Sequence, residues 1–200
     1  MTYSHDALSA LRSSRQSPTM AIDPDPSKLE TTLTLRDGRR VRVRSIRPAD
    51  ASMDRAFFAG LSEQSRYMRF MQHLAELTPR LVRQFTQIDD TREMALVALD
   101  DASGDETIVG IARYVAETER GESAEFAIVL ADAWQGYGLG RGLMEMLIEG
   151  ARRRGLRTLV GSILAVNAPM RALAAALGFT MHPDPEDARH VIATLDLGRT

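Results

Sequence analysis

The chain contains no cysteine among its 200 residues, which excludes disulfide bonds, catalytic thiolates and cysteine-ligated zinc. Its only histidines are His5, His73, His182 and His190, and they do not stand at zinc-motif spacings, so no metal site is expected. No apolar run is long enough for a signal peptide or a membrane span, so we expect a cytoplasmic protein without a membrane partner. A formal net charge of -2 lacks the basic surplus of a dedicated nucleic-acid binder.

The composition is that of a globular protein with a hydrophobic core. Hydrophobic residues make up 44% and charged residues 26% of the chain, and its length suits one domain with some extra chain. The stretch from Ser13 to Ser27 holds three prolines and few apolar side chains, too few to offset the entropy lost on ordering. We therefore predict a flexible extension over residues 1–30 and one folded domain over residues 31–200.

Turn signals and apolar periodicity divide the folded part into strands and helices. Asp37-Gly38 is a strong hairpin signal, and the alternation across residues 41–44 fits a strand with one face toward water. Asp50, Ser62 and Thr78 are each expected to cap the start of a helix. Further helices are predicted over residues 138–154 and 169–177, and strands over residues 33–35, 41–46, 94–99, 108–115, 125–130, 159–166 and 191–197. Early hairpins followed by a strand–helix–strand unit indicate the α/β (α+β) class with a mixed sheet.

A glycine-rich segment, Gln-Gly-Tyr-Gly-Leu-Gly-Arg-Gly over residues 135–142, lies between a predicted strand and a predicted helix. Glycine lets the backbone turn tightly near a ligand, and the first free N–H groups of a helix attract anions, which together suit a pyrophosphate. A tight connection without a ligand is the alternative interpretation. A Walker loop is excluded because its lysine is missing, and a Rossmann fingerprint because the glycine spacing and the late position do not fit.

The segment from Gln135 to Gly140 matches the pyrophosphate motif Gln/Arg-x-x-Gly-x-Gly/Ala of the GNAT superfamily. Asn167, followed by a short helix that ends in Leu-Gly-Phe at residues 177–179, matches that family's second landmark. The chain resembles this superfamily from about residue 33 to residue 197. It more closely resembles the GNAT domain of bacterial Pat-type protein lysine acetyltransferases, in segments 46–50, 61–70, 92–98 and 124–127. The resemblance implies the GNAT fold, a mixed, mostly antiparallel sheet of about seven strands with flanking helices.

The same resemblance implies acetyl-CoA as acyl donor, without a metal. The backbone of residues 128–130 would pair with the pantetheine arm, the glycine turn would hold the pyrophosphate, and Asn167 would lie near the thiol end. A backbone N–H on the Ile128 strand would polarise the thioester carbonyl, and such donors are worth about 10²–10³ in rate. The implied cofactor-binding residues are Ile128, Val129, Leu130, Gln135, Gly136, Tyr137, Gly138, Leu139, Gly140, Arg141 and Asn167.

A catalytic base is also required. A lysine amine starts protonated, with an unperturbed pKa of about 10.4, so a proton must leave before or during attack. In GNAT protein lysine acetyltransferases a glutamate at the place of Glu125 is the general base. The alternative is that Glu125 faces solvent or pairs with an arginine.

The sequence departs from many GNAT enzymes at the general acid. The family often places a tyrosine seven positions after the asparagine, and Ala174 stands there instead. Tyr67 and Tyr137 are candidate substitutes, although packing is the simpler role for both. Arg66 and Arg69 flank Tyr67 in the segment that GNAT enzymes use over the acceptor groove, so both are candidates for substrate contact.

The sequence therefore predicts an N-acetyltransferase that moves the acetyl group of acetyl-CoA to a primary amine by direct attack in a ternary complex. A protein lysine side chain is the leading acceptor, and a small-molecule amine is the alternative. A non-catalytic acyl-CoA sensor is a third hypothesis, which Ala174 suggests and which Glu125 argues against, since a sensor needs no base. An acidic groove would favour a basic lysine peptide, and an enclosed apolar pocket a small amine. A monomer or homodimer is expected.

Overall fold

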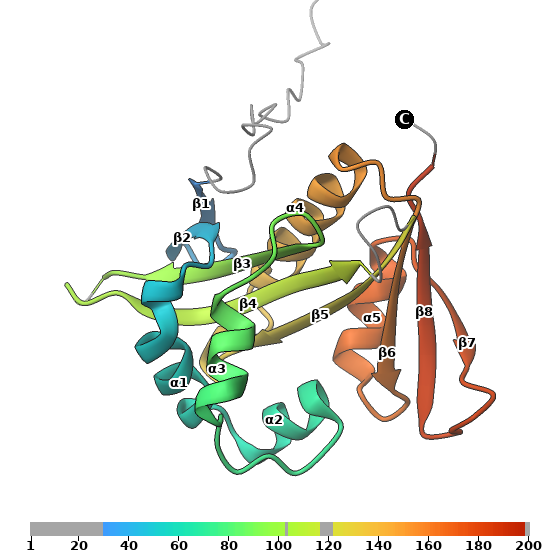
Figure 1. The fold of residues 1–200 in the computed structure, drawn as a ribbon, viewed down its shortest axis with the longest axis horizontal. Coiled ribbons are helices and arrows are strands. Elements are labelled where there is room, and N and C mark those ends of the chain that lie inside the picture. Colours follow the sequence, from blue (N-terminus) through green and yellow to red (C-terminus); the bar gives the residue numbers. More distant parts are fainter. Residues whose placement is uncertain (1–29, 103, 117–121, 199–200) are drawn as a thin grey trace, which may run out of the picture.

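The computed structural model describes residues 30–102, 104–116 and 122–198, so the predicted extension over residues 1–30 lies almost wholly outside the described residues. Within them the strands form one sheet in the order β1-β2-β3-β4-β5-β6-β8-β7, in which β5 and β6 are parallel and all other neighbours antiparallel (Figure 1). The strands are β1 Glu30–Thr34, β2 Arg40–Ser45, β3 Glu93–Asp100, β4 Thr107–Ala116, β5 Ser123–Leu130, β6 Thr158–Leu164, β7 Thr180–Pro183 and β8 His190–Asp196. Strand β7, a short addition at the sheet edge, is the one that the sequence did not predict.

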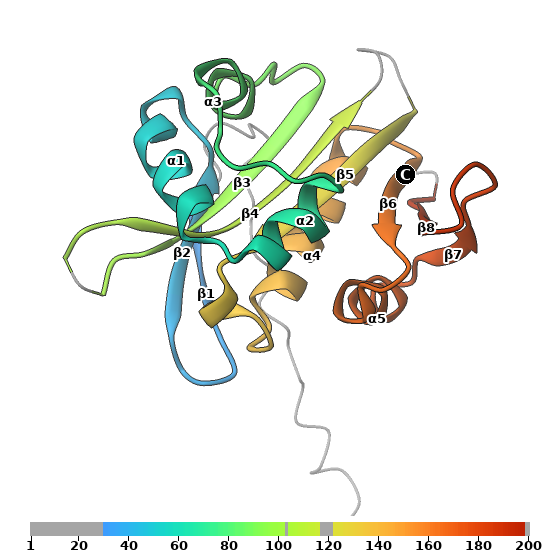
Figure 2. The same cartoon turned by 90° about the horizontal axis from the view of Figure 1, so that it is seen from below.

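Helices cover both faces of the sheet (Figures 1 and 2). One face is covered by α1, α2 and α3, and the other by α4 and α5. The helices are α1 Ala51–Gly60, α2 Glu63–Phe70, α3 Pro79–Thr86, α4 Leu139–Arg153 and α5 Ala168–Ala176, with short 3-10 turns at Pro48–Asp50 and Asp132–Trp134. The order of elements is the one predicted, with the cofactor motif between β5 and α4.

Two hydrophobic cores lie on the two faces of the sheet. Strand β5 belongs to both, because successive side chains of a strand point to opposite faces. Phe126 and Ile128 pack into the core under α4 and α5, and Val129 packs into the core under the first three helices. The side chain of Glu125 therefore shares the face of Val129.

Several local signals act as predicted. The Ser62 hydroxyl accepts a hydrogen bond from the Ser65 N–H, and the Thr78 hydroxyl accepts one from the Leu81 N–H, so α2 and α3 begin at side-chain caps. Gly38 has a φ of 87° in the hairpin turn, as an Asp-Gly turn requires.

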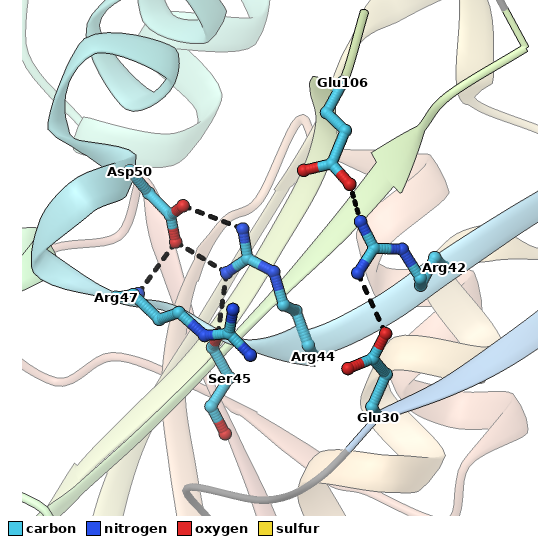
Figure 3. Close-up of polar contacts among 7 residues, drawn as sticks. All are labelled: Glu30, Arg42, Arg44, Ser45, Arg47, Asp50 and Glu106. Atoms are coloured by element: carbon cyan, nitrogen blue, oxygen red, sulfur yellow. Dashed lines mark hydrogen bonds and ion pairs between the residues drawn. The ribbon is translucent and has the colours of Figure 1, made fainter. Parts of the chain in front are cut away.

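Asp50 stands at the N-cap position of α1, where the sequence predicts a cap, but its side chain makes no capping hydrogen bond to that helix. Its carboxylate instead accepts two hydrogen bonds from the Arg44 guanidinium, at 2.7 and 2.8 Å, and one from the Arg47 N–H at 2.7 Å (Figure 3). Both Asp50 and Arg44 are buried. Burial alone would raise the pKa of Asp50, but these hydrogen bonds hold that pKa below its ordinary value.

The predicted wet face of β2 is also corrected by this pair. Arg42 behaves as expected, since it lies near the surface and forms ion pairs with Glu30 and Glu106 (Figure 3). Arg44 lies on the same face of the sheet as Arg42, yet it is only 4% exposed. The turn that carries Asp50 covers it, and a matched carboxylate makes its burial tolerable.

Candidate active site

A groove opens where β5 and β6 separate. The two strands pair at only three positions, the last of which joins Glu125 to Val160. Beyond that point β5 stays paired with β4 and β6 with β8. The facing edges of the two strands bound a groove of about 850 Å³, which residues of α2 and α5 also line. Helix α2 packs on β5.

The β5 backbone presents N–H and C=O groups to this groove. The Ala131 N–H donates to the Val109 carbonyl of β4, which fixes the direction of alternation along the strand. The backbone groups of Ile128 and Leu130 therefore point away from β4, toward the groove. The Leu130 carbonyl accordingly accepts a hydrogen bond from the Gln135 side chain at 3.3 Å. Because strand pairing between β5 and β6 ends at Glu125, Ile128 lies beyond the last β5–β6 pair.

The glycine turn closes one end of the groove. Gly136 and Gly138 have φ values of 83° and 98°, in the left-handed region that favours glycine. Helix α4 begins directly after Gly138, and no side chain caps its first N–H groups. Free N–H groups at a helix start next to a groove form an anion site.

Most of the predicted cofactor residues line this one groove. They are Ile128, Val129, Leu130, Gln135, Gly136, Gly138, Gly140, Arg141 and Asn167. The side chains of Tyr137 and Leu139 do not line it: Leu139 is fully buried in the core, and Tyr137 packs beside Arg39, whose guanidinium lies 4.6 Å from its ring centre. At these two positions the motif predicts that backbone N–H groups bind the cofactor. The direction of the Tyr137 and Leu139 side chains therefore does not test that prediction.

Glu125 lines the same groove, at the last β5–β6 pair. Its side chain is exposed, and it forms no hydrogen bond or ion pair with any described residue. Of the two predicted alternatives to catalysis, the exposed side chain agrees with the solvent-facing one, and a close arginine pair is not seen within the described residues. Arg69 on α2 is near enough for its charge to interact with that of Glu125.

Asn167 and Ala174 lie on the helix at the opposite side of the groove. The Asn167 side-chain oxygen accepts a hydrogen bond from the Met170 N–H at 3.1 Å and so caps α5. Its side chain thus has a structural role that the sequence did not predict. Ala174 is fully buried in the core and does not line the groove.

Neither candidate acid of the sequence lines the groove. The ring of Tyr67 lies beside that of His73, with the ring centres 5.2 Å apart, and Tyr137 packs beside Arg39. Among the described residues, the hydroxyl groups that line it belong to Ser65 and Ser162. No motif marked either residue.

A polar link connects α2 to the glycine turn. Asp132 accepts hydrogen bonds from the Ser62 N–H, the Ser62 hydroxyl and the Ser65 hydroxyl, at 3.0, 2.7 and 2.7 Å. The Gln135 side chain donates to the Ser65 hydroxyl at 3.2 Å. Burial opposes ionisation of Asp132, but these hydrogen bonds lower its pKa below the ordinary value. The start of α2 and the first residue of the cofactor motif thus share one network.

Arginines lie at both ends of the groove. Arg36, in the β1–β2 hairpin, lines the glycine-turn end, where its side chain is 3.8 Å from the place of a Cβ on Gly138. Arg69 lines the end near Glu125. Arg66, the other predicted substrate contact, does not line the groove and donates to the Ala75 carbonyl at 3.1 Å. No sequence pattern predicted that Arg36 lies beside the glycine turn, because the β1–β2 hairpin comes about one hundred residues before that turn in the chain.

The described residues include neither a metal-ligand cluster nor a helix that could cross a membrane. They contain no cluster of three or more histidine, aspartate or glutamate side chains arranged to hold a metal ion. No described helix combines the length and the apolar character needed to span a bilayer.

Comparison with known proteins identifies the family. The family model for the acetyltransferase (GNAT) domain matches residues 40–180. The chain is 42% identical over 164 residues to acetyltransferase PA5475 of Pseudomonas aeruginosa, and the match covers 82% of this chain and 88% of that protein. The GNAT domain of S. lividans PAT superposes with a TM-score of 0.77 at 28% identity, covering 84% of this chain and 96% of that one.

A more distant structure shares the fold. It is yncA, an acetyltransferase of Salmonella typhimurium solved with acetyl-CoA, which superposes with a TM-score of 0.63 at 20% identity over 79% of this chain and 94% of that one. A family match over most of the chain, a relative of similar length and the groove described above agree. The chain belongs to the GNAT family of acetyltransferases.

Proposed function

We propose that this acetyltransferase moves the acetyl group of acetyl-CoA directly to a protein lysine side chain, with Glu125 as general base. One observation carries the assignment of the base. The Glu125 carboxylate is exposed, has no hydrogen-bond or ion-pair partner among the described residues, and lines the same groove as the glycine turn. It is the position in the groove that supports a base over an ordinary solvent-facing glutamate, and a sensor of acyl-CoA would need no base.

The cofactor is held mainly by backbone. The N–H groups between Gly136 and Arg141 bind the pyrophosphate, and the groove-facing groups of Ile128 and Leu130 pair with the pantetheine arm as an added strand would. The Asn167 side-chain amide lies at the groove wall with its nitrogen available for the thiol end. Support comes from the distant Salmonella neighbour, which was solved with acetyl-CoA.

The chemistry needs one proton transfer and one acyl transfer. Glu125 takes a proton from the lysine ammonium, directly or through water, and the freed amine attacks the thioester carbonyl carbon. The Ile128 N–H stabilises the charge that develops on the carbonyl oxygen. The C–S bond then breaks, and the amide product loses its remaining extra proton to solvent. A thiol pKa of about 8.5 lets coenzyme A leave as thiolate, so a tyrosine at position 174 is not required.

The acceptor assignment is supported by similarity to known proteins. The chain matches the GNAT domain of S. lividans PAT over 96% of that domain. The end of the groove near Glu125 is lined by both polar and apolar side chains of α2, among them Gln64, Met68 and Arg69. This lining is not the enclosed apolar pocket expected for a small amine, nor is it the acidic groove expected for a basic lysine peptide, because Arg69 lies beside Glu125. The acceptor assignment therefore rests on the similarity. We also propose that residues 31–200 form a single acetyltransferase domain.

The test is thiol release from acetyl-CoA by the full chain, with and without acceptors. Acceptors are an acyl-CoA synthetase that bears its active-site lysine, lysine peptides and a panel of small amines. Glu125→Gln should lower kcat by roughly 10²–10⁴ near neutral pH, with partial recovery as rising pH frees the amine. Glu149→Gln is the matched control, because Glu149 is half-exposed on α4, pairs with Arg153 and does not line the groove. Wild-type rates in Glu125→Gln at every pH would refute the base, and turnover of small amines alone would refute the acceptor.

A further inference from the structure

We propose that Arg69 binds a carboxylate of the acceptor, so that the preferred acceptor carries an acidic group beside its reactive amine. The inference rests on the proposed function, because it concerns the acceptor side of the same groove. Arg69 lies in the last turn of α2 and lines the groove together with Glu125. An anion bound to Arg69 would therefore be held near the amine from which Glu125 removes a proton.

The Arg69 guanidinium lacks a partner. It makes no hydrogen bond and no ion pair with any described residue, although its side chain is half-buried. Its guanidinium carbon lies 4.9 Å from the centre of the Phe70 ring. A guanidinium carries five N–H donors, and burying a charge is costly unless it is paired. Burial and the nearby Arg113 lower the Arg69 pKa to about 10, against the opposing charge of Glu125, so the group stays charged at neutral pH.

Nearby carboxylates do not supply that partner. Glu93 forms an ion pair with Arg113 at 2.6 Å, and Asp132 is held by the serines that begin α2. Asp54 lines a small cavity together with Arg69, but no ion pair joins the two, and its charge interacts with those of Arg113 and Asp50 instead. The charge of Glu125 does act on Arg69, but no ion pair joins these two side chains either. No described carboxylate therefore pairs with Arg69, and the acceptor can supply one.

The position of Arg69 separates it from the cofactor phosphates. Of the arginines that line the groove, Arg141 pairs with Glu145 at 2.9 Å and donates to the Ala176 carbonyl. Arg36 lies beside the glycine turn, where the anion at hand is a phosphate of the cofactor. Arg69 lies near Glu125, on the helix that packs over β5, and so on the side where the proposed base acts.

Arginine suits this role because its planar group holds a carboxylate through two parallel hydrogen bonds. Such a contact fixes the direction of the acceptor as well as its affinity, and so brings the amine to the thioester in a defined orientation. Two sources supply the same chemistry: an aspartate or glutamate beside the target lysine in a protein, or the carboxylate of a free amino acid.

The experiment compares matched acceptors. One arm uses lysine peptides that differ only in an aspartate or an asparagine beside the lysine, and the other uses free amino acids against their amides. Wild type should favour the carboxylate member by roughly 10- to 100-fold in kcat/KM, mainly through KM, as expected for a hydrogen-bonded charge. Arg69→Gln should abolish the preference, and Arg69→Lys should keep part of it. Arg152→Gln is the control, since Arg152 is exposed in the last turn of α4 and does not line the groove.

The peptide arm and the amino-acid arm identify the source of the carboxylate. No preference in wild type, or an equal preference in Arg69→Gln, would overturn the proposal. If no acceptor is acetylated, the proposed function fails, and a binding measurement decides about Arg69 by itself. In that measurement N-acetylglutamate is titrated into ¹⁵N-labelled protein with acetyl-CoA. A saturable shift of the Arg69 side-chain N–H signal, identified by its loss in Arg69→Gln, supports the carboxylate site, and an unmoved signal overturns it.

Discussion

Removing the charge of Asp54 should stabilise the protein. Asp54 lies in the first turn of α1, is only 3% exposed, and one of its carboxylate oxygens has no hydrogen-bond partner within the described chain. Burial raises its pKa to about 6, an effect that the charge of Arg113 opposes and the charge of Asp50 reinforces. The ionised carboxylate of Asp54 therefore destabilises the folded state relative to the unfolded one.

The size of the effect follows from that pKa. The rise from 3.8 to about 6 is 6 − 3.8, or about 2.2 units, and corresponds to about 3 kcal/mol at about 1.36 kcal/mol per unit. Because the folded pKa exceeds the unfolded one, the folded state binds more protons between these values, and stability falls as pH rises through this window. Asp54→Asn should therefore gain up to about 3 kcal/mol above about pH 7 and little below about pH 4.

Urea denaturation at several pH values measures the difference. Asp90→Asn is the matched control, because Asp90 is exposed. The free energy of unfolding of Asp54→Asn minus that of wild type should grow with pH, while the control difference stays flat. The cavity beside Asp54 has about 30 Å³, enough for one water, and a water bound there would reduce the gain without reversing its sign. A variant less stable than wild type at high pH would refute the reasoning.

Two further predictions concern the other carboxylates. Asp50→Asn removes the charge that balances buried Arg44, so the free energy of unfolding should fall by about 3–5 kcal/mol, and a urea midpoint close to wild type would contradict the buried pair. Asp132→Ala removes the link from Ser62 and Ser65 to the glycine turn, so KM for acetyl-CoA and for the acceptor should rise together. Because the Asp132 carboxylate is exposed, the free energy of unfolding should fall by only about 1 kcal/mol. Steady-state kinetics with both KM values unchanged would show that the link has no role in binding either substrate.

Local sequence patterns predicted much of the fold and identified most of the residues that line the groove. The Asp37-Gly38 turn, the caps at Ser62 and Thr78 and the glycine turn each depend on residues within a few positions of one another. The placement of Glu125 opposite that turn follows from one strand leading into it. These features needed no knowledge of distant contacts, which is why sequence was sufficient for them.

The features that escaped prediction all depend on distant contacts. Asp50 fits the pattern of a helix cap, but Arg44 competes for its carboxylate once β2 lies beside the turn. Asp132 accepts a hydrogen bond from Ser62, which lies 70 residues earlier in the chain, and no motif in either segment predicts this contact. Strand β7 has four residues and ends in a proline, so its pairing depends on the edge that β8 offers. That Arg69 has no ion-pair partner among the described residues can likewise be known only from the three-dimensional positions of its neighbours.

The exposed backbone edge of β5 separates ligand contact from side-chain identity. Ile128 and Leu130 turn their side chains into one core and Val129 into the other, while the backbone N–H and C=O groups of Ile128 and Leu130 face the groove. Substitutions here are therefore constrained by volume and hydrophobicity, and the donors and acceptors at the groove persist through almost any of them. Proline is the exception, because it has no N–H to offer. Relatives can thus diverge in sequence along this strand while presenting the same hydrogen-bonding edge.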